Sequence, residues 1–105
     1  QSSIENEMKA EILLGRDLNL EKAREYALMG KTGLLMEEIS AQAGSQEDFL
    51  KMNIIQRKAL AAAVGMEVNE LADMYSKKAK ADALAEKSLK LQNELTKEIN
   101  TLYNF

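Results

Sequence analysis

Apolar residues recur along this chain at steps of three and four, the spacing that places them on one face of a helix. The first series predicts a helix over residues 3–14 with an apolar stripe of Ile4, Met8 and Ile12. Asn19 is a good N-cap and predicts the start of a second helix that ends at Met29. A third helix should begin at Thr32 or Gly33, and its apolar face consists of Leu34, Leu35, Ile39 and Ala43.

Capping residues and glycines mark the junctions between these segments. Ser45 opens a capping box with an acid, Asp48, at the third position. Asn53 repeats the device with Gln56 and starts a helix over residues 54–64. All five glycines fall between apolar segments, where glycine can end a helix in the left-handed conformation: Gly15, Gly30, Gly33, Gly44 and Gly65. We expect helix junctions at four of them, Gly15, Gly30, Gly44 and Gly65.

The last predicted helix is the longest. It starts at Asn69, and neither glycine nor proline interrupts the chain beyond that residue. A helix of more than thirty residues would be roughly 50 Å long. A stripe along it recurs every 3.6 residues on average, the period of a straight helix, and all its members but Ser88 are apolar: Leu84, Ser88, Leu91, Leu95, Ile99 and Leu102.

A chain of 105 residues cannot cover so long a helix by itself. We therefore expect its distal half to pack on a second chain or on a further part of its own protein. The residues predicted to make a self-association contact are Leu84, Leu91, Leu95, Ile99 and Leu102.

The absence of proline and the small number of glycines leave few of the turn residues that a many-stranded sheet needs. The predicted fold is therefore all-α, with several short helices packed as a compact unit and followed by one long C-terminal helix. The expected division is an N-terminal helix over residues 1–15, a compact multi-helix unit over 16–68 and the long helix over 69–105. The missing initiator Met indicates a piece of a longer chain.

Composition narrows the range of functions. The chain has no Cys and no His, which excludes a Cys/His zinc site, a thiol nucleophile and a Ser-His-Asp triad. Three carboxylate pairs are present: Glu37 with Glu38, Glu47 with Asp48, and Glu94 with Glu98. We interpret each pair as structural, because a di-metal site in a helical bundle also uses His ligands. We predict no enzymatic activity, no cofactor, no metal and no small-molecule substrate.

The net charge indicates whether the chain attracts nucleic acid or a membrane surface. With 14 basic and 17 acidic residues, the net charge of −3 does not attract nucleic acid or an anionic membrane. No apolar run approaches the roughly 20 residues of a membrane span. A lysine-rich segment could form a basic patch but is typical of a solvated helix face: Lys77, Lys78, Lys80, Lys87 and Lys90.

Two other interpretations stay open. Residues 60–71 resemble a helix-turn-helix motif, with Ala61 against the second helix, Gly65 in the turn and Leu71 in the core. The residues that would face DNA include two acids, which disfavours this interpretation: Asn69, Glu70 and Asp73. The third hypothesis is a protein-docking module whose groove takes a partner's amphipathic helix; its lining would be Met52, Met66 and Met74.

The stretch from about residue 12 to residue 76 resembles a segment of bacteriophage tail tape measure proteins. The resemblance rests on four short motifs: LNLEKAR at 18–24, MEEI at 36–39, FLKMN at 49–53 and VNELA at 68–72. Between them fall Gly30, Gly44 with Ser45, and Gly65 with Met66.

Membership of this family would imply a long, mostly helical virion protein that lies along the tail lumen and whose length relates to tail length. It would assemble in several copies with itself and with other tail proteins. It would be found in the host cytoplasm during assembly and then in the virion tail.

Overall fold

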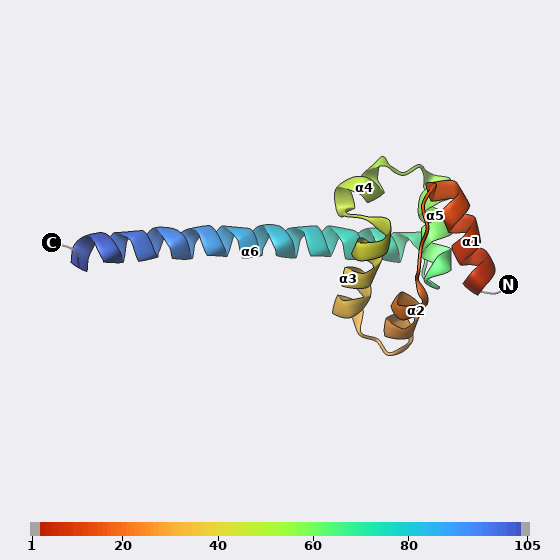
Figure 1. The fold of residues 1–105 in the computed structure, drawn as a ribbon, viewed down its shortest axis with the longest axis horizontal. Coiled ribbons are helices and arrows are strands. Elements are labelled where there is room, and N and C mark those ends of the chain that lie inside the picture. The colour runs from red at the N-terminus through yellow and green to blue at the C-terminus, as the bar shows by residue number, and fades with distance from the viewer. Residues whose placement is uncertain (1–2, 104–105) are drawn as a thin grey trace.

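The computed structural model of this protein describes residues 3–103, and over that range it contains six helices joined by short loops (Figure 1). In chain order they are α1 (Ser3–Leu14), α2 (Glu21–Leu28), α3 (Thr32–Ala43), α4 (Gln46–Lys51), α5 (Ile54–Ala63) and α6 (Val68–Tyr103). The all-α prediction is confirmed, including the long final helix, which begins one residue earlier than Asn69.

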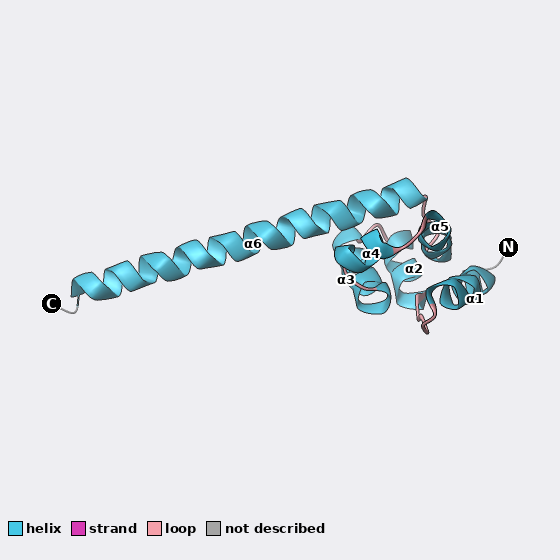
Figure 2. Ribbon diagram, turned by 90° about the horizontal axis from the view of Figure 1, so that it is seen from above, coloured by secondary structure: helices cyan, strands magenta, loops and turns pink. Residues whose placement is uncertain are grey.

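The first five helices and the start of α6 pack together, and the rest of α6 projects away from them (Figures 1 and 2). The molecule is therefore elongated, with principal extents of 69 × 29 × 23 Å. We call residues 3–79 the compact unit and residues 80–103 the distal part of α6. The division predicted from the sequence placed residues 1–15 apart, whereas α1 packs along α5 inside the compact unit.

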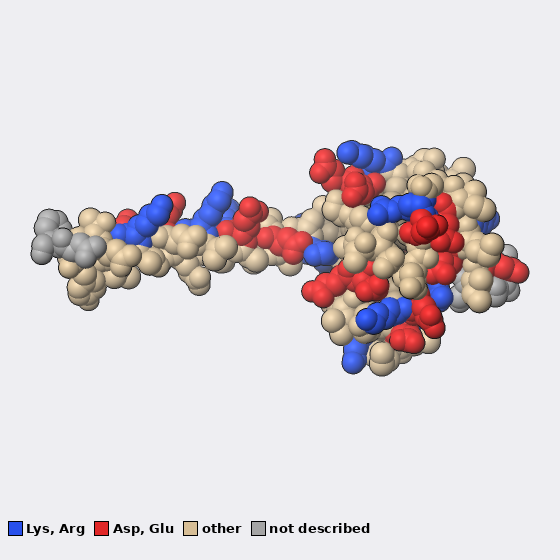
Figure 3. Space-filling model, viewed as in Figure 1, with Lys and Arg blue, Asp and Glu red and all other residues tan. Residues whose placement is uncertain are grey.

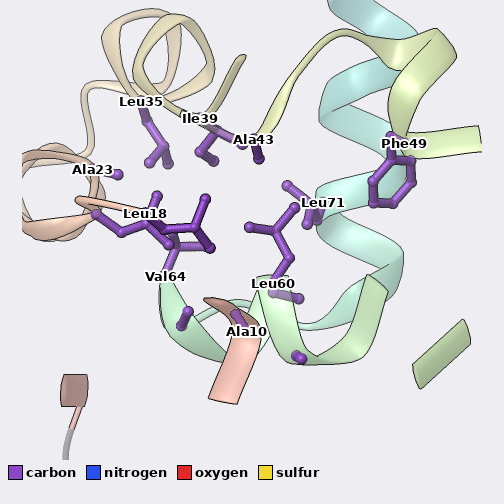
Figure 4. Close-up of a cluster of buried hydrophobic side chains, with 14 of the residues drawn as sticks. Ala10, Leu18, Ala23, Leu35, Ile39, Ala43, Phe49, Leu60, Val64 and Leu71 are labelled. Carbon is purple, nitrogen blue, oxygen red and sulfur yellow. The ribbon is translucent and has the colours of Figure 1, made fainter. Parts of the chain in front are cut away.

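The core of the compact unit takes residues from every helix and from the loop that joins α1 to α2 (Figure 4). Leu20, Ile39, Leu60 and Leu71 are each fully buried within it. Many of the remaining core residues are alanines, whose small side chains let the short helices approach one another closely: Ala10, Ala23, Ala43, Ala59, Ala61 and Ala63.

The apolar stripe predicted for α1 does not face the core. Ile4, Met8 and Ile12 lie on the solvent side of the helix, with exposed fractions of 64%, 55% and 79%. The face that packs against the core carries Ala10, which is fully buried, with Leu13 and Leu14 beside it. The helix carries apolar residues on two sides, and α5 packs against the side with the small residue.

An extended loop runs between α1 and α2 and buries both Leu18 and Leu20. Figure 4 shows Leu18 among the core side chains. Side chains from neighbouring helices accept hydrogen bonds from its backbone N–H groups. The Leu18 N–H donates to Glu11 Oε2 at 2.9 Å, and the Leu20 N–H donates to Glu7 Oε1. Because these carboxylates replace water as acceptors, the loop can lie against the core without an unpaired donor at either leucine.

The predicted N-cap at Asn19 is wrong. The residue before α2 is Leu20, and no side chain caps that helix locally. The backbone N–H of Asn19 instead donates to Gln42 Oε1 of α3 at 3.0 Å. Asn19 therefore belongs to the extended loop, where its backbone N–H is held by Gln42, a residue distant in sequence.

The other local junction signals are confirmed. Both capping boxes form, Ser45 with Asp48 ahead of α4 and Asn53 with Gln56 ahead of α5. Four glycines have positive φ and lie at helix junctions: Gly15, Gly30, Gly44 and Gly65. Gly33, expected between segments, lies instead in the first turn of α3 with no positive φ.

Tyr75 fastens α6 to the compact unit. Its ring stacks on Phe49 of α4 with centroids 4.6 Å apart, and its hydroxyl donates to the Gly44 carbonyl at 2.8 Å. The pKa of Tyr75 is raised to about 12, mainly by burial and also by the negative charge of Asp48, while Arg16 acts in the opposite direction. The neutral phenol is therefore the form that the folded protein stabilises.

Candidate self-association surface

The distal part of α6 has no cover within the described chain. Every residue from 80 to 103 is exposed, and the only buried residues of α6 are Leu71 and Tyr75 near its start. At 1.5 Å per residue, these 24 residues form a free helix about 36 Å long (Figure 2).

This free helix keeps large apolar side chains in contact with water. The five residues predicted for self-association, which we call the α6 stripe, have exposed fractions between 50% and 69%: Leu84, Leu91, Leu95, Ile99 and Leu102. Charged side chains follow one edge of this helix, and uncharged ones follow the opposite edge (Figure 3). Scattered surface leucines are ordinary, but a continuous apolar row of this kind marks an interaction surface.

The α6 stripe lies on the side of the helix that faces away from the compact unit. Leu84 comes nine residues after Tyr75, and Leu102 comes 27 residues after it. At 3.6 residues per turn these separations are about 2.5 and 7.5 turns, so both leucines lie opposite Tyr75. Leu91 and Leu95 fall within roughly 20° of the same line. A partner helix could therefore lie along the stripe without meeting the compact unit of the same chain.

Two further apolar features are exposed besides the α6 stripe. Leu89 and Tyr103 lie on the distal part of α6 outside the stripe, with exposed fractions of 58% and 85%. The outer face of α1, with Ile4, Met8 and Ile12, forms a second apolar row on the compact unit. The steps of four residues along α1 indicated an apolar face, but the sequence held no signal that this face would be left outside.

The lysine-rich segment is partly neutralised by local ion pairs. Lys77 lies 3.0 Å from Asp73, and Lys78 lies 3.0 Å from Asp82, each pair one turn apart on α6. Such exposed pairs contribute only a few tenths of a kcal/mol each, but they reduce the positive charge available to a polyanion. Lys80, Lys87 and Lys90 lie further along the helix and are exposed.

The corner between α5 and α6 has the packing expected of a helix-turn-helix. Ala61 and Leu71 are buried, and Gly65 in the turn has φ of 76°. The first turns of α6 expose Asn69 and Glu70, so a duplex at this surface would meet negative charge. DNA binding stays a hypothesis that the electrostatics disfavour.

The three methionines of the predicted docking groove differ in their surroundings. Met74 borders a shallow pocket of about 350 Å³ between α3 and α6, together with Met36, Thr32 and Gly33. Met52 and Met66 pack against the core and do not line that pocket. Docking of a partner helix on the three methionines stays a hypothesis.

Members of two of the three carboxylate pairs make local contacts that stabilise helices. Asp48 belongs to a capping box, Glu47 lies 3.9 Å from Lys51, and Glu38 accepts from Gln42. Within residues 3–103, no three acidic, His or Cys side chains come together in a way that could hold a metal ion. Over the same part of the chain, no helix is long and apolar enough to cross a membrane.

Comparisons with protein-family models, with curated proteins and with solved structures find no match to this chain. The candidate self-association surface is therefore inferred from the residues of α6 alone.

Proposed function

We propose that this chain is a structural, non-catalytic segment that associates with further copies of itself through the α6 stripe. The observation that carries the proposal is the row of five large apolar side chains that the compact unit leaves in water. Burying the exposed part of one such leucine contributes about 1 kcal/mol. A row of them on each of two helices would offset the loss of translational and rotational freedom on association.

The resemblance to tail tape measure proteins supports a more specific proposal. In it, this chain is a segment of a tape measure-like protein that acts in tail assembly and in setting tail length, with itself and other tail proteins as partners. A compact helical unit beside a long helix suits a rod-like protein made of successive segments. This part of the proposal rests on the motifs in residues 18–72, and the gene context tests it. We expect a reading frame with hundreds of further helical residues beside other tail genes, and a short reading frame elsewhere would contradict it.

Sedimentation equilibrium tests the self-association directly. We expect the apparent mass of the wild-type chain to rise with protein concentration. The double variant Leu91→Asp, Leu95→Asp places two charges in the middle of the α6 stripe and should stay monomeric over the same range. Unchanged association of this variant would overturn the proposal.

A matched control separates loss of the stripe from a general effect of added charge. Leu89 and Asn93 have the same spacing as Leu91 and Leu95 but lie on the opposite side of α6. The double variant Leu89→Asp, Asn93→Asp should therefore associate like the wild type. Equal loss of association in both double variants would show that the stripe has no special role.

A further inference from the structure

We propose that the α6 stripe takes a second copy of the same helix in antiparallel orientation, with Leu91 of one copy opposite Leu95 of the other. This inference rests on the proposed self-association and adds the direction and register of the partner. Three features support this orientation: the charges on the two sides of the stripe, their order along α6 and the position of the compact unit.

The two flanks of the α6 stripe differ in charge. At about 100° per residue, one flank carries two lysines followed by two glutamates in chain order: Lys87, Lys90, Glu94 and Glu98. The other flank, over the same length, carries only uncharged residues: Ala81, Ala85, Gln92 and Thr96. All eight residues are exposed.

The symmetry of a helix pair decides which flanks meet. In a parallel pair the two-fold axis runs along the helices, so each flank faces the unlike flank of the partner. In an antiparallel pair the axis is perpendicular to the helices, so like flanks face each other. Residues that flank an apolar seam set the orientation of helix pairs through such contacts. Only the antiparallel pair brings the charged flank of one copy against the charged flank of the other.

One register satisfies both the leucines and the charges. Placing Leu91 opposite Leu95 of the second copy also places Leu84 opposite Leu102. The same register brings Lys87 within one residue of the level of Glu98, and both lie within about 60° of the stripe. Lys90 lies about 120° round α6 from the stripe, too far to face the partner. By two-fold symmetry each opposite-charge contact occurs twice. The order of lysines before glutamates along α6 is therefore self-complementary only when the helices run in opposite directions.

The compact unit leaves room for this arrangement. The pairing uses residues 84–102, which lie beyond the part of α6 that packs on the compact unit. The stripe faces away from Tyr75 and its contacts, so the two compact units would lie at opposite ends of the helix pair.

Disulfide trapping tests the orientation, because the sequence contains no Cys that could compete. Two single variants, Leu84→Cys and Leu102→Cys, are oxidised separately and as an equal mixture. We expect a cross-linked dimer in the mixture and none in either variant alone. In the antiparallel pair, like positions 84 and 84 lie about 27 Å apart along the helix, beyond the reach of a disulfide.

The outcomes separate this inference from the proposed function. Cross-linking of each variant with itself would show a parallel pair and overturn the inference, while self-association would stand. Dimers in sedimentation without any cross-link in the mixture would overturn the register. A monomeric wild-type chain would overturn both proposals.

Charge exchange gives a second readout that does not alter the leucines. Lys87→Glu and Glu98→Lys should each weaken dimerisation about three- to ten-fold, because each turns two opposite-charge contacts into like-charge contacts. The double variant Lys87→Glu, Glu98→Lys should restore the wild-type dissociation constant. Equal dissociation constants for the wild type and both single variants would contradict the antiparallel pairing, because a parallel pair would place neither charge against the other.

Discussion

Both the compact unit and the distal part of α6 contain leucines, but the compact unit buries several of its leucines, whereas the distal part of α6 leaves its own exposed. In the compact unit, leucines such as Leu20 and Leu60 are fully buried, and the N–H groups of the buried loop find acceptors. In the distal part of α6, leucines at regular spacing keep half or more of their surface in water. Short helices can cover one another, whereas a single straight helix presents its apolar face to whatever lies outside the chain.

The difference shows which forces maintain each region. The compact unit is held by burial and by hydrogen bonds between helices distant in sequence. The distal part of α6 has only its backbone hydrogen bonds, its good helix formers and local contacts such as Lys78 with Asp82. A helix without tertiary packing is marginal in water, so this region should depend on a partner and the compact unit should not.

The largest contrast should come from removing one leucine from each region. Leu60→Ala opens a cavity in the core and should lower the free energy of unfolding by about 2–5 kcal/mol. Leu91→Ala should change it by less than about 0.5 kcal/mol in the monomer, because that side chain packs on nothing in its own chain. Urea denaturation at low protein concentration measures both values. Similar losses in the two variants would show that α6 is packed in the free chain.

Two glycines allow the next comparison, within the compact unit. Gly44 has φ of 106°, and a Cβ there would lie 2.9 Å from the Cβ of Asp48 in the capping box. Gly44→Ala should therefore cost about 2 kcal/mol or more through backbone strain and the clash. Gly33 is in a helix with open space around it, so Gly33→Ala should stabilise by about 0.5–1 kcal/mol. Thermal unfolding of both variants tests this, and equal effects would contradict the assignment of Gly44 as the strained junction.

The smallest of the three effects concerns the contact that joins the regions. Tyr75→Phe removes the hydrogen bond to the Gly44 carbonyl and should cost about 1 kcal/mol at neutral pH. The raised pKa of Tyr75 adds a pH dependence. Above about pH 10 the unfolded chain ionises this tyrosine, while the folded protein keeps it neutral until about pH 12.

Stability of the wild type should therefore fall between pH 10 and 12 more steeply than that of the Phe variant. Denaturation curves of the two proteins at several pH values measure the difference, and other titrating groups cancel in the comparison. Parallel loss of stability would show that Tyr75 titrates normally and is not held in its neutral form.

Features set by neighbouring residues could be predicted from the sequence. The boxes at Ser45 and Asn53 need only a side chain three residues away, and the left-handed turns at junctions such as Gly65 need only a missing Cβ. The length of α6 follows in the same way from the absence of interrupting glycine or proline. The α6 stripe was likewise visible in the spacing of its leucines.

Features set by packing could not be predicted. Both sides of α1 are apolar, and only the position of α5 decides which side is covered. The cap expected at Asn19 failed because Glu7 and Gln42, both distant in sequence, hold the loop in another conformation. Tyr75 of α6 contacts Phe49 of α4 and the carbonyl of Gly44. Because these residues are far apart in the sequence, no local pattern could predict the contacts.

Amide hydrogen exchange at low and high protein concentration tests the central claim that one region is self-sufficient and the other needs a partner. We predict slow exchange in the core helices at both concentrations. In residues 84–102, exchange should be fast in the dilute protein and slow markedly as the concentration rises. Exchange in this segment that is equally slow at both concentrations, or equally fast, would contradict the account.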